Sequence, residues 1–560
     1  MRAIKHVLLW SSLGTLLALG WAAYQENVLQ EWRKLQHDYR AALPPAESAA
    51  FGVRLRQIYV PALGASDRCV SCHVGMTPGE AAHSGDRRFA PHPDVVHDPA
   101  RFGCTVCHGG QGLATVKADA HGDVRHWPEP GIPQRFLYAG CGSCHTHLRI
   151  ASVATLEAGR DLLERYDCLA CHRLEGRGGT LRPGRAGGME GPDLSRAGAA
   201  GYRRDWYQDH LARSERETQQ GPWRVSFAAI GDADVRAIDV FLDSRAGAPG
   251  LVEAKALFHS LGCLGCHSVH GVGGDDGPDL TLEGQKDPGQ LDFTHVPGDR
   301  DLSRWLAEHF RAPAKVVPDS AMPYLGLTEA QIEGLVFYML SLRQTEFPEA
   351  FWPEDRIRAQ HFGEREFATD GATLYGTFCA ACHGQQGQGM RYPGMPAFPA
   401  IANPDFLALA PDDFLRQTIH RGRPGRRMPA WGEKSGGLRP EEVETLVAFL
   451  RRLGGAVPVE ADPRPPRWAA GDGARGAELW KANCASCHGA EGEGAEGPAL
   501  ANRVLLESAT DTYLFETVGR GRRGTSMPAF SVPSPVRRTL AEEEIESLVA
   551  HIRGWEVESR

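Results

Sequence analysis

The hydrophobic and polar positions divide the chain into one long apolar run near the N-terminus and a series of shorter amphipathic segments. Val7 to Gln25 (VLLWSSLGTLLALGWAAYQ) contains no charged residue, and a helix of that length can just span the hydrocarbon core of a bilayer. Glu31 to Leu43 (EWRKLQHDYRAAL) follows with the composition of an exposed helix. We therefore predict a transmembrane helix and then a helix that leaves the membrane.

The residues before the apolar run indicate its orientation. Arg2, Lys5 and His6 precede it, and a basic flank predicts a cytoplasmic N-terminus with the rest of the chain on the other side. The alternative is a cleaved signal peptide, for which Ala18-Leu19-Gly20 is a passable cleavage site. The run exceeds the usual apolar core of a signal peptide, which favours an uncleaved anchor.

Further along, one pattern occurs four times and predicts four helical units. Each unit opens with a short helical segment and closes with a helix whose apolar positions share one face and whose acidic residues lie at its positive dipole end. The opening segments are 158–172, 254–267, 370–383 and 475–488, and the closing helices are 232–245, 329–343, 441–453 and 542–555. Proline-rich joints separate units at 346–355 and 458–468.

All fourteen cysteines belong to seven copies of Cys-x-x-Cys-His, the attachment signature of c-type haem. The two thiols add to the haem vinyl groups, and the histidine becomes the proximal iron ligand. Zinc binding and a redox dithiol are the alternatives, but neither requires a histidine after the second cysteine. The motifs are Cys69, Cys72 and His73; Cys104, Cys107 and His108; Cys141, Cys144 and His145; Cys168, Cys171 and His172; Cys263, Cys266 and His267; Cys379, Cys382 and His383; Cys484, Cys487 and His488.

The spacing of the motifs predicts two kinds of organisation. The first three lie 35 and 37 residues apart, which leaves no room for a separate fold around each haem, whereas the last four lie 95, 116 and 105 residues apart. We expect the anchor or signal sequence at 1–27, a three-haem module at 28–150, and haem domains at 151–248, 249–348, 364–457 and 468–560.

The net charge of the chain and the chemistry of haem attachment limit where the protein is located and which partners it has. The net charge of -9 argues against nucleic acid as a partner. Because thioether attachment takes place outside the bacterial cytoplasm, the haem domains should be exported. We therefore expect them on the periplasmic or other extracytoplasmic side of the cytoplasmic membrane.

Residues 155–560 resemble class I cytochromes c, in which Cys-x-x-Cys-His lies on the first helix and a loop carrying methionine precedes the final helix. The predicted fold is therefore mainly α, with an N-terminal transmembrane helix, a loop-rich three-haem module and four class I cytochrome c-like helical domains. The resemblance implies methionine as the sixth iron ligand. Met322, Met428 and Met527 each precede a proline and lie 39 to 55 residues after their haem histidine. Met395 is only twelve residues after His383 and is interpreted as loop packing.

The unit around His172 has no methionine at the equivalent position, where Trp223 falls instead. Met189, His210 or a residue from elsewhere could ligate this haem, or its sixth position could be open. His210 aligns with His309 of a unit that has its own methionine, so a surface position is the preferred interpretation for it. An open iron would permit an alternative function as a haem enzyme, such as a peroxidase or a small-molecule reductase.

The three-haem module has histidines outside its motifs, so bis-histidine ligation is expected there. The candidates are His83, His92, His97, His121, His126 and His147, of which His92, His97 and His121 are favoured by their sequence settings. The segments QIYVPALGASDRCVSCHVG and HDPARFGCTVCHGGQGLAT, behind the anchor, resemble multihaem cytochromes that accompany cytochrome b-type quinol-oxidising complexes. This resemblance covers about residues 30–150 and implies a neighbouring membrane subunit.

These ligand sets predict a direction of electron flow. Methionine opposite histidine raises haem potential, and two histidines generally leave it lower. Low-potential haems would then lie next to the anchor and high-potential haems further along. The predicted function is electron transfer from a quinol-oxidising membrane partner through seven haem c groups to a soluble or membrane acceptor, with the protein as a redox-carrier subunit. Arginines near Met428 and Met527 are expected either to pair with haem propionates or to form a basic docking rim.

Overall fold

The computed structural model describes residues 2–77, 86–92, 95, 97–124, 127, 129–179, 191–200, 230–248, 250–343, 346–456 and 462–558. The fold is mainly helical, as predicted, and three two-stranded antiparallel sheets occur within these ranges. The chain divides into two compact units. The first contains Met1–Thr146, Leu282–Trp305 and Met339–Pro353, and the second contains His147–Thr281, Leu306–Tyr338 and Glu354–Arg560.

The first unit begins with the predicted apolar helix. Helix α1 (Arg2–Asn27) has exposed side chains along its length, and its segment Ala3–Asn27 is long and apolar enough to cross a membrane. Helix α2 (Glu31–Ala42) follows, as predicted, and α3 (Pro45–Ala50) comes next. On α2 the buried Gln36 donates from Nε2 to the carbonyl oxygens of Arg54 and Ser71, both at 2.9 Å. These bonds tie α2 to the segment that carries the first haem motif.

The rest of this unit consists of short elements, as the close haem spacing predicts. The buried Asp67 holds two haem motifs together, because it accepts hydrogen bonds from the backbone N–H groups of Cys104 and Thr105 and from the Thr105 hydroxyl. The elements are β1 (Ile58–Val60), η1 (Pro61–Leu63), β2 (Ala65–Asp67), η2 (Cys69–Ser71), η3 (Arg87–Phe89), α4 (Pro99–Phe102), α5 (Thr105–His108), α6 (Lys117–Ala120), η4 (Gln134–Ser143), η8 (Glu283–Gln285), η9 (Pro288–Gln290) and η10 (Glu349–Phe351).

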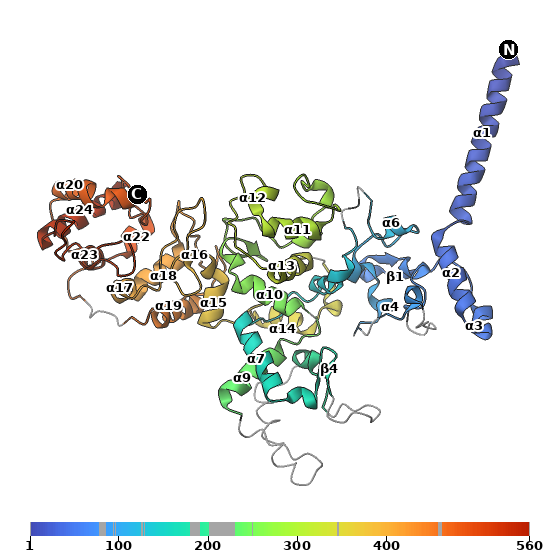
Figure 1. Ribbon diagram of the computed structural model, residues 1–560, viewed down its shortest axis with the longest axis horizontal. Helices are drawn as coiled ribbons and strands as arrows, with labels where there is room; N and C mark the ends of the chain where they lie inside the picture. The colour runs from blue at the N-terminus through green and yellow to red at the C-terminus, as the bar shows by residue number, and fades with distance from the viewer. Residues whose placement is uncertain are drawn as a thin grey trace, which may run out of the picture. The chain divides into compact units, whose positions relative to one another are not determined.

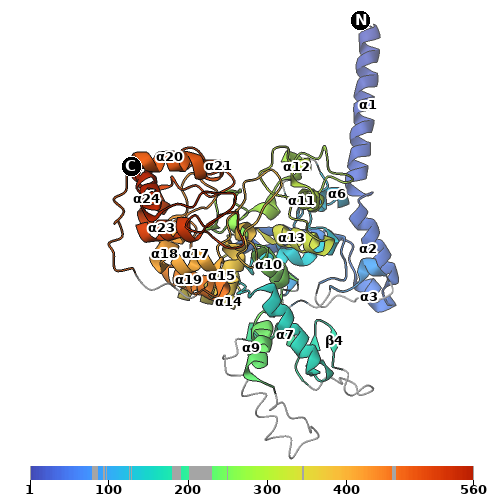
Figure 2. The same ribbon diagram turned by 60° about the vertical axis from the view of Figure 1, so that its left-hand side comes forward.

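The second unit contains the helix pairs expected from the repeats. The pairs are α7 (Val153–Arg165) with α9 (Asp232–Asp243), α10 (Leu251–Ser260) with α13 (Glu329–Ser341), α15 (Gly371–Phe378) with α19 (Pro440–Gly454), and α20 (Gly473–Asn483) with α24 (Glu542–Glu558). Figures 1 and 2 show the α7–α9 and α20–α24 pairs side by side. A glycine permits α20 and α24 to cross closely, since a Cβ on Gly476 of α20 would lie 2.0 Å from the carbonyl oxygen of Ser547 on α24.

Shorter elements complete the four repeats and carry the haem motifs and the methionine loops. Near the motifs are η5 (Cys168–Ala170), η7 (Cys263–Gly265), α16 (Ala380–His383), α21 (Ala485–His488) and the hairpins β3 (Arg173–Leu174) with β4 (Arg177–Gly178) and β5 (Ser268–Val269) with β6 (Val272–Gly273). The others are η6 (Leu194–Ala200), α11 (Leu302–Arg311), α12 (Pro313–Val316), α14 (Glu354–Phe362), α17 (Pro404–Leu409), α18 (Asp412–Arg421), α22 (Arg503–Ser508) and α23 (Asp511–Arg520).

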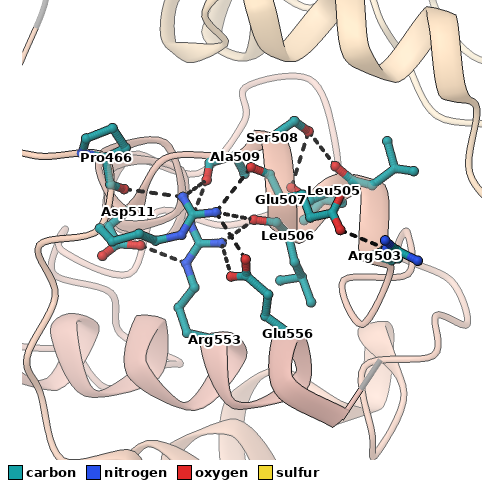
Figure 3. A network of polar contacts seen from close by, with 12 residues as sticks. Pro466, Arg503, Leu505, Leu506, Glu507, Ser508, Ala509, Asp511, Arg553 and Glu556 are labelled. Carbon is teal, nitrogen blue, oxygen red and sulfur yellow. Dashed lines mark hydrogen bonds and ion pairs between the residues drawn. The ribbon is translucent and has the colours of Figure 1, made fainter. Parts of the chain in front are cut away.

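A buried polar network fixes the last helix of the final repeat. Figure 3 shows Arg553 of α24 donating to the carbonyl oxygens of Leu506 and Ala509 and to the carboxylate of Asp511. The second oxygen of Asp511 accepts from the backbone N–H groups of Trp468 and Ala469. The network therefore ties α24, the α22–α23 loop and the incoming proline-rich joint to one another.

Candidate haem sites

The seven Cys-x-x-Cys-His motifs share one backbone turn. In each, the N–H of the second cysteine lies 3.0–3.2 Å from the carbonyl oxygen of the first, and the histidine N–H lies 2.8–3.0 Å from that same oxygen. None of the fourteen cysteines forms a disulfide bond, so all of their sulfur atoms remain for haem attachment. A single helical turn therefore places two thiols and one imidazole together at every motif, and this is the donor set that covalent haem attachment requires.

In the four later motifs a proline carbonyl orients the proximal imidazole. Its Nδ1 lies 2.8–2.9 Å from that oxygen, in the pairs His172–Pro192, His267–Pro278, His383–Pro399 and His488–Pro498. Because a carbonyl oxygen can only accept, Nδ1 carries the proton and Nε2 is left for iron. The string Gly-Pro-Asp-Leu occurs at 191–194 and again at 277–280, and its proline is the one that orients His172 or His267.

In three of these four loops a glycine precedes the proline and lets the loop approach the ring. A Cβ at Gly191, Gly277 or Gly497 would lie 2.3, 2.7 or 2.8 Å from an atom of the respective imidazole. Burial lowers the pKa of His383 and His488, against the opposing effect of their proline carbonyls. Both rings therefore stay neutral near pH 7, and the neutral ring is the form that binds a metal.

In the first unit, each motif histidine faces a second histidine. The ring centroids of His73 and His121 lie 6.3 Å apart, those of His108 and His92 lie 6.0 Å apart, and those of His145 and His97 lie 6.2 Å apart. Two imidazoles that bind one metal from opposite sides, each with a bond of about 2 Å, have centroids roughly 6 Å apart. All three separations fit an iron between the rings.

Burial also keeps histidines of these pairs neutral. It lowers the pKa of His73, with His121 adding to the effect, and it lowers the pKa of His108, with His92 and His73 adding to it. The partners His92, His97 and His121 are the three that the sequence settings favoured. His83 and His126 lie outside the described residues, and His147 lies instead 3.9 Å from the Glu366 carboxylate.

The methionines lie in equivalent loops of their repeats. The Arg423 N–H donates to the Met428 carbonyl at 2.9 Å, and the Arg522 N–H donates to the Met527 carbonyl at 3.0 Å. Met322, like these two, is half-buried. Met395 accepts a hydrogen bond at its sulfur from Arg427 at 3.0 Å, in line with a packing role. In the His172 unit the candidates Met189 and His210, and also Trp223, lie outside the described residues.

Arginines of the two methionine loops provide a further test of whether haem fits. Arg423 donates from Nη2 to the Thr418 hydroxyl, and Arg522 donates from Nη2 to the Tyr513 hydroxyl. Yet Arg423 Nη1 and Arg522 Nε are buried with no hydrogen-bond partner among the described residues. Burial lowers the pKa of Arg423 to about 10, so it remains charged. Two equivalent unmatched cationic donors suit the propionate carboxylates of haem.

Four other arginines in or beside these loops have acidic partners within the chain. The ion pairs are Arg421 with Glu507, Arg427 with Asp276, Arg520 with Glu516 and Arg523 with Asp405. Three of these pairs join consecutive repeats, whereas Arg520 and Glu516 both lie on α23, and all four balance positive charge of the loops. The arrangement does not favour the basic docking rim considered from the sequence.

Comparison with known proteins agrees with this geometry. A family model described as cytochrome c oxidase, cbb3-type, subunit III matches residues 366–450 and 471–552. A second, described as cytochrome c, matches residues 251–343. Cytochrome c domains of this kind hold covalently bound haem c, which is the cofactor that the thiols and imidazoles above suit.

Similar proteins include a subunit of a cbb3-type cytochrome c oxidase and a cytochrome c subunit of a cytochrome bc1 complex. The chain is 32% identical over 170 residues to the cbb3-type cytochrome c oxidase subunit FixP of Bradyrhizobium diazoefficiens, covering 29% of this chain and 53% of that protein. It is 25% identical over 221 residues to the cytochrome bc1 complex cytochrome c subunit of Corynebacterium diphtheriae, covering 37% of this chain and 72% of that protein. The chain thus spans about half the length of the first of these relatives.

A Kuenenia stuttgartiensis reducing HAO-like protein complex also matches, with 19% identity over 33% of this chain and 94% of that chain and a TM-score of 0.23. The fold assignment rests on the family models and on the repeated geometry. Residues 251–343, 366–450 and 471–552 are cytochrome c domains, and the candidate membrane helix Ala3–Asn27 precedes them in the chain.

Proposed function

We propose that this chain is a membrane-anchored electron conduit. It takes electrons from a quinol-oxidising membrane partner and passes them through seven haem c groups to an extracytoplasmic acceptor. The observation that carries the proposal is the division of ligands between the two compact units. Three histidine pairs lie in the unit that contains α1, whereas Met322, Met428 and Met527 lie in the other unit.

We infer that each histidine pair binds one iron and that each of the three methionines binds the iron of its own repeat. Bound haem supplies a one-electron iron couple, and the ligands of the chain set its potential. Histidine pairs beside the anchor hold their irons at low potential, and the histidine–methionine sets hold theirs at higher potential. Electrons then run downhill from the membrane-proximal module toward the C-terminal domains. Relatives that are named as subunits of membrane complexes support a membrane partner for this chain as well.

The test is a redox titration of the purified holoprotein followed by optical and electron paramagnetic resonance spectroscopy. We expect a low-potential group with bis-histidine signals and a high-potential group with methionine signals. His121→Met should move one haem from the first group to the second. His147 lies two positions after His145 and belongs to none of the three pairs, so His147→Gln should leave the low-potential and the high-potential groups of haems unchanged. The direction of flow is wrong if the histidine-paired haems titrate above the methionine-ligated haems.

Carbon monoxide added to the reduced protein tests the remaining haem, that of His172. No binding supports a conduit in which every iron has six ligands. A carbon monoxide complex that disappears with Cys168→Ala and Cys171→Ala would instead favour a haem enzyme with its reaction centre at this site.

A further inference from the structure

Two haem motifs of different repeats lie against each other. Cys266, in the turn after α10, and Cys382, on α16, are close enough for their side chains to interact. The two residues are 116 positions apart, and they belong to two different matched domains, 251–343 and 366–450. Their contact is therefore a feature of how two cytochrome domains pack.

The backbones at this contact are close because glycine flanks the first motif. A Cβ on Gly262 would lie 2.7 Å from the Ala381 backbone nitrogen and 2.9 Å from the Ala381 Cβ. A Cβ on Gly265 would lie 3.3 Å from the Phe378 carbonyl oxygen. Any side chain at Gly262 would push the two motifs apart.

Polar contacts hold the same two domains around the motifs. Arg427, next to Met428, donates from Nε to the Asp276 carboxylate at 2.8 Å, and Asp276 lies two residues before Pro278, whose carbonyl orients His267. The Gly273 N–H also donates to the Gly436 carbonyl at 3.2 Å. The loop behind one proximal histidine is thus tied to the methionine loop of the next domain.

We propose that the haem groups which the motifs of His267 and His383 would hold form an electronically coupled pair, because the two motifs pack against each other at Gly262, Cys266 and Cys382. Cys266 and Cys382 would each carry a thioether bond to its own haem, so the packing of the motifs would hold the two haems close together. One electron would move from the donor haem, which is oxidised, to the acceptor haem, which is reduced, and no bond would form or break. This inference rests on the proposed function for the presence of haem at both motifs and for the high potential of these two haems.

Circular dichroism in the Soret region tests the pair, because two haems in contact couple their transition dipoles and give a two-signed band. The protein is the full holo chain, reduced with ascorbate, and the spectrum is the reduced-minus-oxidised difference. Ascorbate reduces only high-potential haems, so the histidine-paired haems do not contribute. The wild type should show the two-signed band, and Gly262→Val should lose it.

Gly271→Val is the matched control. Gly262 and Gly271 both have a φ of +75°, so valine strains the backbone equally, but a Cβ at Gly271 would meet nothing within 4 Å. The control should keep the band. A wild type without the band, or a Gly262→Val protein with full haem content and the wild-type band, overturns the pair.

If Gly262→Val does not retain its haem, Arg427→Gln provides the second variant, with Arg421→Gln as its control because Arg421 pairs with Glu507 of a different domain. Arg427→Gln should weaken the band and Arg421→Gln should not. Equal bands in the two variants overturn the pair. Quinol oxidation is measured separately, so a protein that shows the band but accepts no electrons from quinol disproves the proposed function and leaves the haem pair standing.

Discussion

A buried ion pair between consecutive repeats offers a quantitative test of how they are held together. Lys255 Nζ of α10 lies 2.7 Å from Glu366 Oε2, and the two side chains are 4% and 23% exposed. His270 Nδ1 lies 3.3 Å from the other carboxylate oxygen. Burial alone would raise the pKa of Glu366, but Lys255 and His270 outweigh it and hold this pKa well below its usual value. The carboxylate is therefore ionised near neutral pH.

Lys255→Met keeps the length of the side chain and removes its charge. Removing one partner of a buried ion pair costs about 3–5 kcal/mol, because the other charge stays buried without compensation. Since Glu366 keeps some exposure and His270 stays nearby, we expect the lower end, about 3 kcal/mol. Arg391→Met is the control, because Arg391 and Glu496 form a pair with both side chains more than 60% exposed, and such pairs contribute about 0–1 kcal/mol.

The assay is native-state hydrogen exchange of the α10 and α15 amides in the holoprotein. It measures the free energy of local opening, which is suitable because a chain with several domains does not unfold in one step. The double variant Lys255→Met with Glu366→Gln should recover part of the loss, since it removes the unpaired charge. A loss below about 1 kcal/mol in Lys255→Met, or a double variant as unstable as the single one, would refute this reasoning.

Three further predictions concern acid stability, haem potential and ligand geometry. Burial and, to a smaller extent, Lys255 lower the pKa of His259 in the folded protein to about 3, whereas the unfolded chain takes up this proton near pH 6.5. The contribution of the neutral His259 to the free energy of unfolding is therefore complete above pH 6.5 and falls by roughly 2 kcal/mol toward pH 5. Hydrogen exchange should detect this loss, and His259→Phe should abolish it. Arg423→Met removes a buried positive charge that disfavours oxidised iron, so a redox titration should show one haem potential lowered by about 1 kcal/mol, or roughly 40 mV. Arg520→Met removes a charge at an exposed position and should change the haem potentials little. The ring planes of His92 and His108 are 72° apart, whereas those of the other two histidine pairs are 31° and 40° apart. The haem between His92 and His108 should therefore give a strongly anisotropic low-spin electron paramagnetic resonance signal. His92→Met should remove that signal and leave the other two bis-histidine signals.

Much of the local structure could be predicted from the sequence. The turn at each haem motif forms within five residues, through hydrogen bonds to the carbonyl of its first cysteine, so its geometry needs no distant partner. The helices that open and close the repeats follow from apolar positions spaced at the helical period, and α7, α9, α19 and α24 occur where that spacing predicts them. The proline that orients each later proximal histidine also lies close in sequence, and in three of these four repeats the Gly-Pro pair, at 191–192, 277–278 and 497–498, was the signal that could have revealed its role.

Contacts between distant residues were decided only by tertiary structure. The sequence settings favoured His92, His97 and His121 but could not say which motif each one faces, because loop closure over tens of residues has many solutions of similar entropy. The contact between Cys266 and Cys382 depends on two glycines and an ion pair that act across a domain boundary. The arginines of the methionine loops are a second example. Some of them pair with carboxylates and others have buried donors without a partner among the described residues, and the packing of consecutive repeats decides which arginine is which.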